Sequence, residues 1–382
     1  MKDNPFQKLM FRPMEIDKIC TLWQQHANSS QLQPISLAFG QSNFPVWEYA
    51  DLTLQAEEIE QVVGYGDIRG QISLREKISH FYETVLGVHV SPKQILITDG
   101  ATSALVLALG IFVTPGKEVI VPEVAYSSYA RVINLFKGKP VWAPLDENFN
   151  LDSDRLSDLI TDKTVAIICN SPGNPHGNIS SLELLAEVAS LGVPVIFDEV
   201  YQCTTFTDTF APSALQLLGE HFIINGFAKS FAVPGLRMGF AIVPSCYIEA
   251  AENLKVLLNL CPNLPGQLLV ERLLAQSKIV LNAHRHYLHS CRDNFLKVSS
   301  HHMLPLLNYP QAGFYGIIAL PKHIDSMTAA EILAVDYAIA TVPGTDFSEQ
   351  DPHFLRINFT GNMADVDEAL LRIAQGLQKM AS

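Results

Sequence analysis

The chain is poor in charged residues, and in positive charge above all. Only 17% of its 382 residues are charged, and 26 lysines and arginines stand against 39 aspartates and glutamates, which gives a formal net charge of −13. No run of basic residues interrupts this pattern, which argues against nonspecific binding to nucleic acid or to an anionic membrane. An anionic small substrate would have to be held by a few well-placed arginines.

Paired cysteines and long apolar runs are also missing from the sequence. The six cysteines, at positions 20, 169, 203, 246, 261 and 291, are scattered and form no CxxC pair. This argues against a disulfide scaffold or a zinc site and suits a reducing cytoplasm. The first residues carry no apolar signal segment, and no uncharged apolar run approaches membrane-spanning length. We therefore expect a cytoplasmic protein without a bound metal.

Short apolar runs, by contrast, are frequent, and 48% of the residues are hydrophobic. Between residues 95 and 245 these runs alternate with helical stretches. The strand-like runs are 94–98, 118–122, 165–169, 193–197, 222–225 and 238–243. This alternation is typical of an α/β fold with a mostly parallel sheet covered by helices on both faces. Such sheets bind ligands beyond the carboxyl ends of their strands, where polar, glycine-rich segments stand here.

The pattern changes after residue 245. Helical stretches are followed by two strand-like runs and a final amphipathic helix; these segments are 245–260, 267–299, 312–319, 354–359 and 365–379. The second helical stretch is long and is expected to be broken. We predict a large domain over residues 45–288 and a smaller α+β domain made of residues 1–44 and 289–382.

Lys229 comes shortly after the apolar segment 222–225 and lies beside small residues. Burial disfavours the ammonium form of lysine, so its pKa would fall and its amine could attack a carbonyl cofactor and hold it as a Schiff base. Arg237 follows shortly after, where a fixed cation could hold a phosphate. Taken alone, Lys229 is better explained as a strand-end lysine whose amine reaches solvent.

Polar residues also follow two other apolar runs. Asp198 ends one of them, and a buried carboxylate is costly unless it has a partner such as a protonated ring nitrogen. The hydroxyl of Tyr201 could lie near the same ring. For an isolated aspartate, a helix cap or a structural ion pair is the more common explanation. Asn174 lies in the segment 170–177, where two prolines and two glycines fix a loop; an ordinary turn would look similar.

Two further segments could bind anions. Small residues from Gly100 to Thr102 lead into a helix whose free N–H groups could hold a phosphate, although any strand-to-helix turn looks similar. The dinucleotide fingerprint GxGxxG is absent, because the segment from Gly64 to Gly70 has the wrong spacing. Arg356 lies within an apolar strand, where it needs a carboxylate from a substrate or from the protein itself.

Together these segments resemble the class I/II aminotransferases, the fold-type-I pyridoxal-phosphate enzymes of the aspartate aminotransferase superfamily. The family pattern N-P-x-N-P-T-G is similar to residues 170–177, D-E-x-Y to 198–201, and S-x-S-K-x-F-x-x-P-G-L-R-x-G to 226–239. A Y-x-x-x-x-G segment at 65–70 and an aromatic residue at 126 also match. The resemblance runs over nearly the whole chain in the right order, and it implies a large domain of the seven-stranded type.

The resemblance also implies contacts to the cofactor ring. Lys229 would form the internal aldimine with pyridoxal 5′-phosphate and later move the proton between substrate and cofactor. Asp198 would pair with the ring nitrogen and keep it protonated, so that the ring accepts electrons. Asn174 and Tyr201 would bond the phenolic oxygen, and Tyr126 would stack on the ring.

Contacts to the phosphate and the substrate follow from the same resemblance. The phosphate would be held by Gly100, Ala101, Thr102 and Arg237. Tyr65 would reach the phosphate of a neighbouring subunit, which implies a homodimer with shared sites. Arg356 would bind the substrate α-carboxylate in a bidentate manner, supported by the backbone near Gly40.

The sequence departs from the family pattern at three places. Gly226 and Ala228 stand where the family usually has serines, and the serine at the first position binds the phosphate. Thr102, Ser103, Ser230 or a water molecule could replace it. His176 replaces a threonine, and we interpret it as a turn residue rather than a substrate-facing imidazole. Asp99 is expected to point away from the phosphate.

The predicted reaction is transamination between an L-amino acid and a 2-oxo acid. A β-eliminating C–S lyase on the same fold is the alternative, because both reactions use the ring as an electron sink. A non-catalytic binding protein is disfavoured because so many of the required residues are present. The side chain of the substrate is not readable; if it carries a second carboxylate, Arg12, Arg69 and Arg131 are the candidates to bind it.

Overall fold

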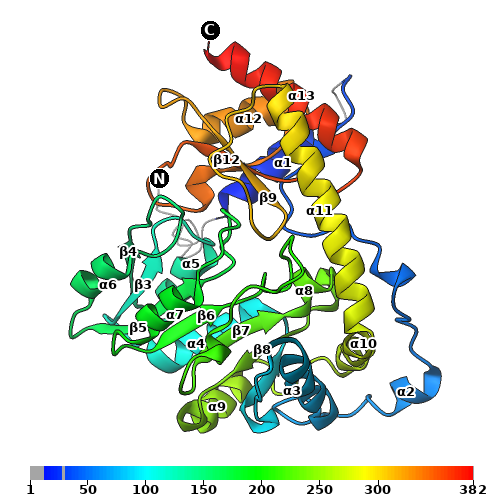
Figure 1. Ribbon diagram of the computed structural model, residues 1–382, viewed down its shortest axis with the longest axis vertical. Helices are drawn as coiled ribbons and strands as arrows, with labels where there is room; N and C mark the ends of the chain where they lie inside the picture. The colour runs from blue at the N-terminus through cyan, green and yellow to red at the C-terminus, as the bar shows by residue number, and fades with distance from the viewer. Residues whose placement is uncertain (1–12, 28–30, 382) are drawn as a thin grey trace, which may run out of the picture.

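The computed structural model describes residues 13–27 and 31–381. In Figure 1 a broad lower part holds the large sheet, and a narrower upper part holds the smaller sheets. The long helix α11 (Ser277–His301) runs from one part to the other (Figure 1). None of the described helices is long and apolar enough to cross a membrane. The predicted cytoplasmic location stays a prediction.

The large sheet has seven strands in the order β2-β8-β7-β6-β5-β3-β4. Their bounds are β2 (Ile95–Thr98), β3 (Glu118–Pro122), β4 (Lys139–Ala143), β5 (Thr164–Asn170), β6 (Val195–Asp198), β7 (Phe222–Gly226) and β8 (Gly239–Ile242). β8 is antiparallel to both of its neighbours, and all other pairs are parallel. The predicted mostly parallel sheet is confirmed. The edge strand β4 was not predicted.

Helices cover both faces of this sheet, as predicted. Ile95 and Ile97 of β2 belong to one apolar core, and Leu96 between them belongs to the other. The first core includes residues of α3 (Ile72–Leu86), α6 (Ser153–Leu159), α7 (Leu182–Ala189), α10 (Leu264–Ala275) and α11. The second includes residues of α4 (Ala101–Phe112), α5 (Ser128–Leu135) and α9 (Ile248–Leu258). Since side chains alternate across a strand, each strand needs apolar residues throughout.

Local sequence signals set several helix ends. Ser181 caps α7, since its hydroxyl accepts a hydrogen bond from the N–H of Leu184. Gly87 ends α3 in the left-handed conformation, at a φ of 68°. The long helical stretch predicted after residue 267 is indeed broken, between α10 and α11 at Gln276.

The smaller part joins the N-terminal segment to the C-terminal third of the chain. β9 (Tyr315–Ala319), β12 (Phe354–Asn358) and β11 (Val342–Pro343) form an antiparallel sheet, and β1 (Ile35–Ser36) pairs with β10 (Ile339–Ala340). Helices α1 (Glu15–Ala27), α12 (Ser326–Asp336) and α13 (Met363–Ala381) pack around them. Within α11, Leu281 belongs to a core of the large part and Leu288 to that of the small part. The predicted residue boundaries remain a prediction.

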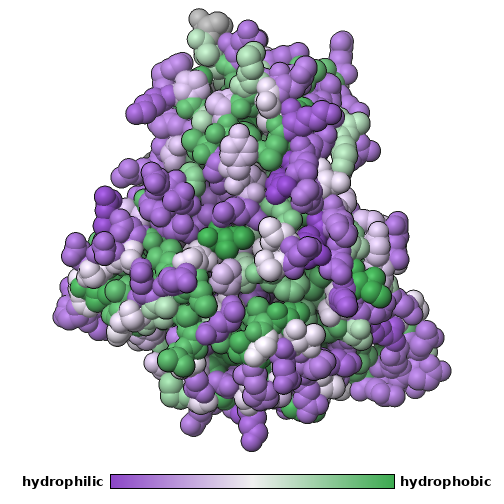
Figure 2. All heavy atoms as spheres, in the orientation of Figure 1, coloured by the Kyte–Doolittle hydropathy of each residue, from purple (hydrophilic) through white to green (hydrophobic). Residues whose placement is uncertain are grey.

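Polar side chains cover most of the face shown in Figure 2, and apolar ones gather mainly in its middle and lower regions. The remaining α-helices of the described chain are α2 (Ala56–Glu60) and α8 (Phe227–Ser230).

Candidate active site

A cavity of about 430 Å³ lies where the carboxyl ends of the large sheet's strands face the smaller part. All predicted site residues except Tyr65 line it: Gly40, Gly100, Ala101, Thr102, Tyr126, Asn174, Asp198, Tyr201, Lys229, Arg237 and Arg356. Residues far apart in the sequence thus meet at one place, because parallel strands end at the same edge of their sheet.

One end of the cavity is built to hold an anion. Helix α4 begins there with Gly100 at a φ of 83°, and no side chain caps its first N–H groups. This positive φ favours glycine, and a Cβ atom at Gly100 would lie 2.7 Å from Nη2 of Arg237. The guanidinium of Arg237 donates to the carbonyl of Pro234 (3.2 Å) and forms no ion pair with a described residue. A phosphate would find a helix N-terminus and a cation here.

Asp198 is buried at the end of β6 and lines the same cavity. Its Oδ2 accepts a hydrogen bond from the hydroxyl of Tyr129 (2.7 Å) and its Oδ1 one from the N–H of Val200 (3.3 Å). Burial raises the pKa of Asp198 to about 6, although both hydrogen bonds and the charge of Lys229 lower it. A cation beside this carboxylate would relieve the cost of its burial.

Lys229 lies in α8, one turn beyond β7. Its Nζ donates a hydrogen bond to the carbonyl of Gly40 and lies 5.8 Å from the ring centroids of Tyr201 and Phe314. The amine is half-buried and reaches the cavity rather than the outer surface. This geometry argues against the alternative of a strand-end lysine whose amine is directed to bulk solvent.

Arg356 and Asn174 lie side by side on another wall. Nη1 of Arg356 donates to Oδ1 of Asn174 (3.2 Å), and Nη2 donates to the carbonyl of Ala38 (2.7 Å). Its buried Nε has no hydrogen-bond partner, and no carboxylate of the described residues forms an ion pair with it. The geometry therefore supports a carboxylate ligand rather than an intramolecular salt bridge.

The departures from the family pattern have structural explanations. At Gly226 a Cβ atom would lie 3.2 Å from both the Cα of Gly239 and the carbonyl of Met238, so a serine would be crowded. Ser103 donates to the carbonyl of Asp99 (3.1 Å) and Ser230 lines a separate small cavity, whereas Thr102 lines the main one. Of these three side chains, Thr102 alone lines the main cavity.

Two further expectations are confirmed. The carboxylate of Asp99 accepts a hydrogen bond from Nδ2 of Asn259 (2.5 Å) and lines a different cavity. His176 is buried and stacked on Phe149 at 4.2 Å between ring centroids, and burial lowers its pKa to about 3. It does not line the main cavity.

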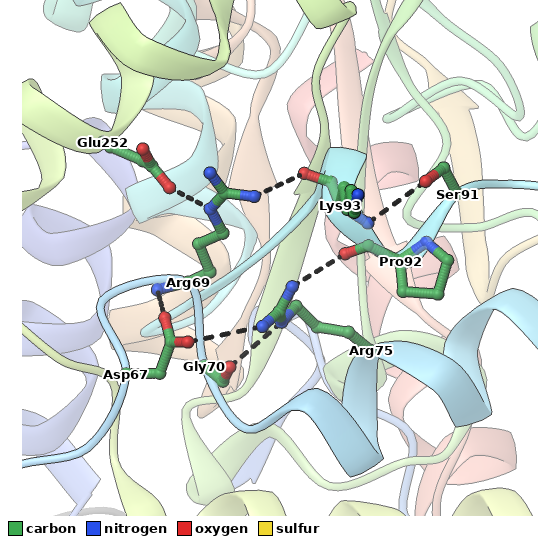
Figure 3. Close-up of polar contacts among 8 residues, drawn as sticks. All are labelled: Asp67, Arg69, Gly70, Arg75, Ser91, Pro92, Lys93 and Glu252. Carbon is green, nitrogen blue, oxygen red and sulfur yellow. Dashed lines mark hydrogen bonds and ion pairs between the residues drawn. The ribbon is translucent and has the colours of Figure 1, made fainter.

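Of the arginines considered for a second substrate carboxylate, Arg69 and Arg131 do not line the cavity of their own chain. Arg69 is paired with Glu252 and donates to the carbonyl of Lys93 (3.3 Å) (Figure 3). Arg131 lies in α5, where its charge lowers the pKa of Asp346 against the larger effect of burial. Arg12 lies outside the described residues.

Tyr65 is 88% exposed. Its segment is fixed by Arg75, which donates to the carbonyls of Gly70 and Pro92 (3.0 Å each) and to Asp67 (3.4 Å) (Figure 3). Tyr65 does not line the cavity of its own chain.

The lining residues that the sequence reasoning missed include Tyr129, Tyr315 and Asp346. Tyr129 follows the predicted ring-stacking Tyr126 by one helical turn, which is a signal that it shares the same face. Tyr315 and Asp346 belong to the smaller part, and no local pattern marked them.

The lining residues fit pyridoxal phosphate. A cation and the start of a helix lie at one end of the cavity. A buried carboxylate without a cationic partner lies at the other end, and an amine lies beside these groups. The ring of Tyr126, half-buried on the wall, offers an aromatic face.

Comparisons with known proteins agree with this geometry. The family model described as aminotransferase class I and II matches residues 34–373. An aspartate aminotransferase of Pyrococcus abyssi is 31% identical over 366 residues, covering 90% of this chain and 92% of that protein. Aromatic-amino-acid aminotransferase 2 of Thermococcus litoralis is 28% identical over 385 residues, covering 97% of each. Among solved structures, an aspartate aminotransferase single mutant of Thermus thermophilus superimposes with a TM-score of 0.87 at 25% identity, covering 99% of this chain and 100% of that chain. The chain belongs to the class I and II aminotransferases, and it is an enzyme that uses pyridoxal phosphate to transfer an amino group between amino acids and keto acids.

Proposed function

We propose that this chain transaminates an L-amino acid that carries one carboxylate, with Lys229 as the residue that holds the cofactor and moves the proton. The observation that carries this proposal is that the amine of Lys229, the carboxylate of Asp198 and the guanidinium of Arg356 line one cavity. No observation favours the C–S lyase alternative.

Bound pyridoxal phosphate supplies an aldehyde carbon and a ring that accepts the electron pair released at the substrate Cα. Asp198 would keep the ring nitrogen protonated, since a buried carboxylate stabilises a neighbouring cation. Tyr201 and Asn174 would orient the phenolic side of the ring. The amine of Lys229 would move the proton from the substrate Cα to C4′ of the cofactor.

Arg356 orients the substrate. Its two outer nitrogens can bind the two oxygens of an α-carboxylate, and Asn174 lies within hydrogen-bond distance of the same guanidinium. This fixes Cα relative to the amine of Lys229. A half-buried cavity also limits the access of water to the reacting atoms.

The lining residues favour an uncharged substrate side chain. Among the described residues that line the cavity, the cations are Lys229, Arg237 and Arg356, and each already has a role. The remaining charged groups on the wall are the carboxylates of Asp17 and Asp346. Apolar side chains stand beside them: Met14, Ile16, Phe39 and Phe347. A second substrate carboxylate would be repelled by the acidic groups, whereas an apolar or aromatic side chain would be accepted.

We also propose a homodimer in which Tyr65 reaches the partner's phosphate. Support comes from its exposure and from large apolar side chains that are exposed in the described chain: Phe39 (49%), Trp47 (70%), Val63 (80%) and Leu257 (82%). Exposed apolar groups of this number are typical of an interface. Mixed dimers of the Lys229→Ala and Tyr65→Ala chains test this, because one of their two sites would contain both native residues.

If the partner supplies Tyr65, refolding the two inactive or weakened chains together should restore up to about a quarter of the wild-type activity. If Tyr65 acts within its own chain, or not at all, mixing should restore nothing.

The reaction itself is tested by mixing the holoenzyme with one amino donor and no acceptor. Transamination should convert the cofactor to its amine form and release one 2-oxo acid per site. Release of ammonia with continued turnover would contradict transamination. In a donor panel, aromatic and aliphatic amino acids should have a higher kcat/KM than aspartate. A preference for aspartate would contradict the proposed side-chain selectivity.

A further inference from the structure

Tyr315 contacts two parts of the active site, and none of the sequence motifs predicted this role. It is the first residue of β9, it is 2% exposed, and it follows Gly313, whose φ is 79°. In the register of the sheet, Arg356 of β12 lies opposite Ile317, so Tyr315 is its diagonal neighbour on the same face. Both side chains line the cavity.

The ring of Tyr315 supports the guanidinium of Arg356. The Cζ atom of Arg356 lies 4.1 Å from the centroid of this ring and 5.0 Å from that of Phe347. Its Nε is buried without a partner, and no ion pair within the described chain fixes the group. Cation–π stacking therefore holds Arg356 in place together with the bonds to Asn174 and Ala38.

The hydroxyl of Tyr315 contacts a different part of the machinery. It lies 3.0 Å from the hydroxyl of Tyr201, and both are buried. It also fills the space where a Cβ atom of Gly40 would lie, 2.5 Å away, while the amine of Lys229 would be 3.6 Å from that atom. The hydroxyl of Tyr315, the backbone of Gly40 and the amine of Lys229 therefore converge.

We propose that Tyr315 is a positioning residue with two separable roles: its ring orients Arg356 for the substrate carboxylate, and its hydroxyl makes Tyr201 a stronger hydrogen-bond donor. A hydroxyl that accepts one hydrogen bond donates a stronger one, and this effect is larger away from water. Tyr201 then stabilises the negative charge on the phenolic oxygen of the bound cofactor. This inference rests on the proposed function, because it assumes that Lys229 holds the cofactor.

Two substitutions separate the roles. Tyr315→Phe keeps the ring and removes the hydroxyl. The hydroxyl of Tyr201 would then be a weaker hydrogen-bond donor. The phenolic oxygen of the cofactor would therefore attract the proton on the neighbouring Lys229 nitrogen more strongly. The pKa of the cofactor-bound Lys229 nitrogen, read from an absorption titration of the holoenzyme, should then rise by roughly 0.5 to 1 unit, the equivalent of one hydrogen bond. The KM for amino acids should stay within about twofold, because a phenylalanine ring still stacks on Arg356.

Tyr315→Leu removes the ring as well. It should produce the same rise in pKa and should also raise the KM for amino acids by about tenfold, but not the KM for amines that lack a carboxylate. Tyr82→Phe is the matched control, because Tyr82 is equally buried and its hydroxyl accepts a hydrogen bond from Asn225 (2.9 Å) outside the cavity. It should change neither quantity.

An unchanged pKa in Tyr315→Phe would overturn the role of the hydroxyl, and an equal rise in KM for amines and amino acids in Tyr315→Leu would overturn the role of the ring. A wild-type protein in which Lys229 does not hold the cofactor would instead refute the proposed function. The two failures are therefore distinguishable.

Discussion

The hydroxyl of Tyr129 donates a hydrogen bond of 2.7 Å to Oδ2 of Asp198, and both residues are buried. This bond connects helix α5 to the end of strand β6. It holds the carboxylate in the ionised form, because a donor to the charged oxygen lowers the pKa that burial has raised. Tyr126, which lines the same wall, contacts Tyr129 edge to face at 5.7 Å.

Removing this hydroxyl should weaken cofactor binding. In Tyr129→Phe the carboxylate of Asp198 loses a hydrogen bond to a charged group, so the Kd for pyridoxal phosphate should rise by about tenfold. Absorption or fluorescence titration of the apoenzyme measures this Kd. An unchanged Kd would mean that Val200 and the ring nitrogen alone fix Asp198.

Arg356→Ala should affect carboxylate recognition rather than the chemistry. The KM for amino acids should rise by roughly a hundredfold, since two charge-assisted hydrogen bonds are lost, while amines that lack the carboxylate should be affected much less. Arg356→Lys is the matched variant, because it keeps the charge but loses the planar group that stacks on Tyr315. Equal losses for both substrate types would show that Arg356 has a structural role.

Restoring the usual serine at position 226 should not improve the enzyme. The new side chain would be crowded by Gly239 and Met238, so Gly226→Ser should lower the free energy of unfolding by about 1–3 kcal/mol. Ala228→Ser provides the control, because Ala228 lines the cavity. Denaturant unfolding and cofactor titration together test this. Tighter cofactor binding by Gly226→Ser at unchanged stability would contradict the structural explanation.

Glu199 predicts a specific dependence of stability on pH. Burial raises its pKa from 4.5 to about 8, even though Ser213 and the N–H of Ala214 donate hydrogen bonds to it. Between these two values the folded state keeps a proton that the unfolded state has lost, so this carboxyl stabilises the fold most at low pH. Its contribution falls by roughly 1.4 kcal/mol for each pH unit in this window and is lost above pH 8.

Glu199→Gln should remove this dependence, because the amide does not ionise and can still bond Ser213 and Ala214. Urea unfolding of the apoenzyme at several pH values should therefore give a shallower decline for the variant than for the wild type. Parallel declines would mean that Glu199 does not titrate in this range. Asp198 titrates in both proteins and so cancels in the comparison.

Local sequence patterns were sufficient for most of the large sheet, and together with the family resemblance they predicted most of the residues that meet at the cavity. Apolar strands ending in polar residues predict where Asp198, Asn174 and Lys229 meet, because parallel strands share an edge. Strand β4 was not predicted. It lies at the edge of the sheet, where Lys139 is exposed and most of its other residues are half-buried, and this weakens the apolar pattern in the sequence. Tyr315 could not be predicted, since its contacts to Tyr201 and Arg356 depend on how the two parts of the molecule pack.

The contacts of Arg69 could not be predicted from the sequence either. Nothing in the sequence around Arg69 indicates its pairing with Glu252, which is distant along the chain (Figure 3). The crowding at Gly226 likewise arises from the pairing of β7 with β8, in which Gly226 lies opposite Gly239.

The central claim is that Lys229 holds the cofactor, and chemical trapping tests it most directly. Borohydride reduction of the holoenzyme should fix the cofactor covalently, and peptide mass spectrometry should find the added mass on Lys229 and on no other lysine. The Lys229→Ala chain should remain folded, with no trapped cofactor and no transamination. Label on a different lysine, or turnover by Lys229→Ala, would contradict the account.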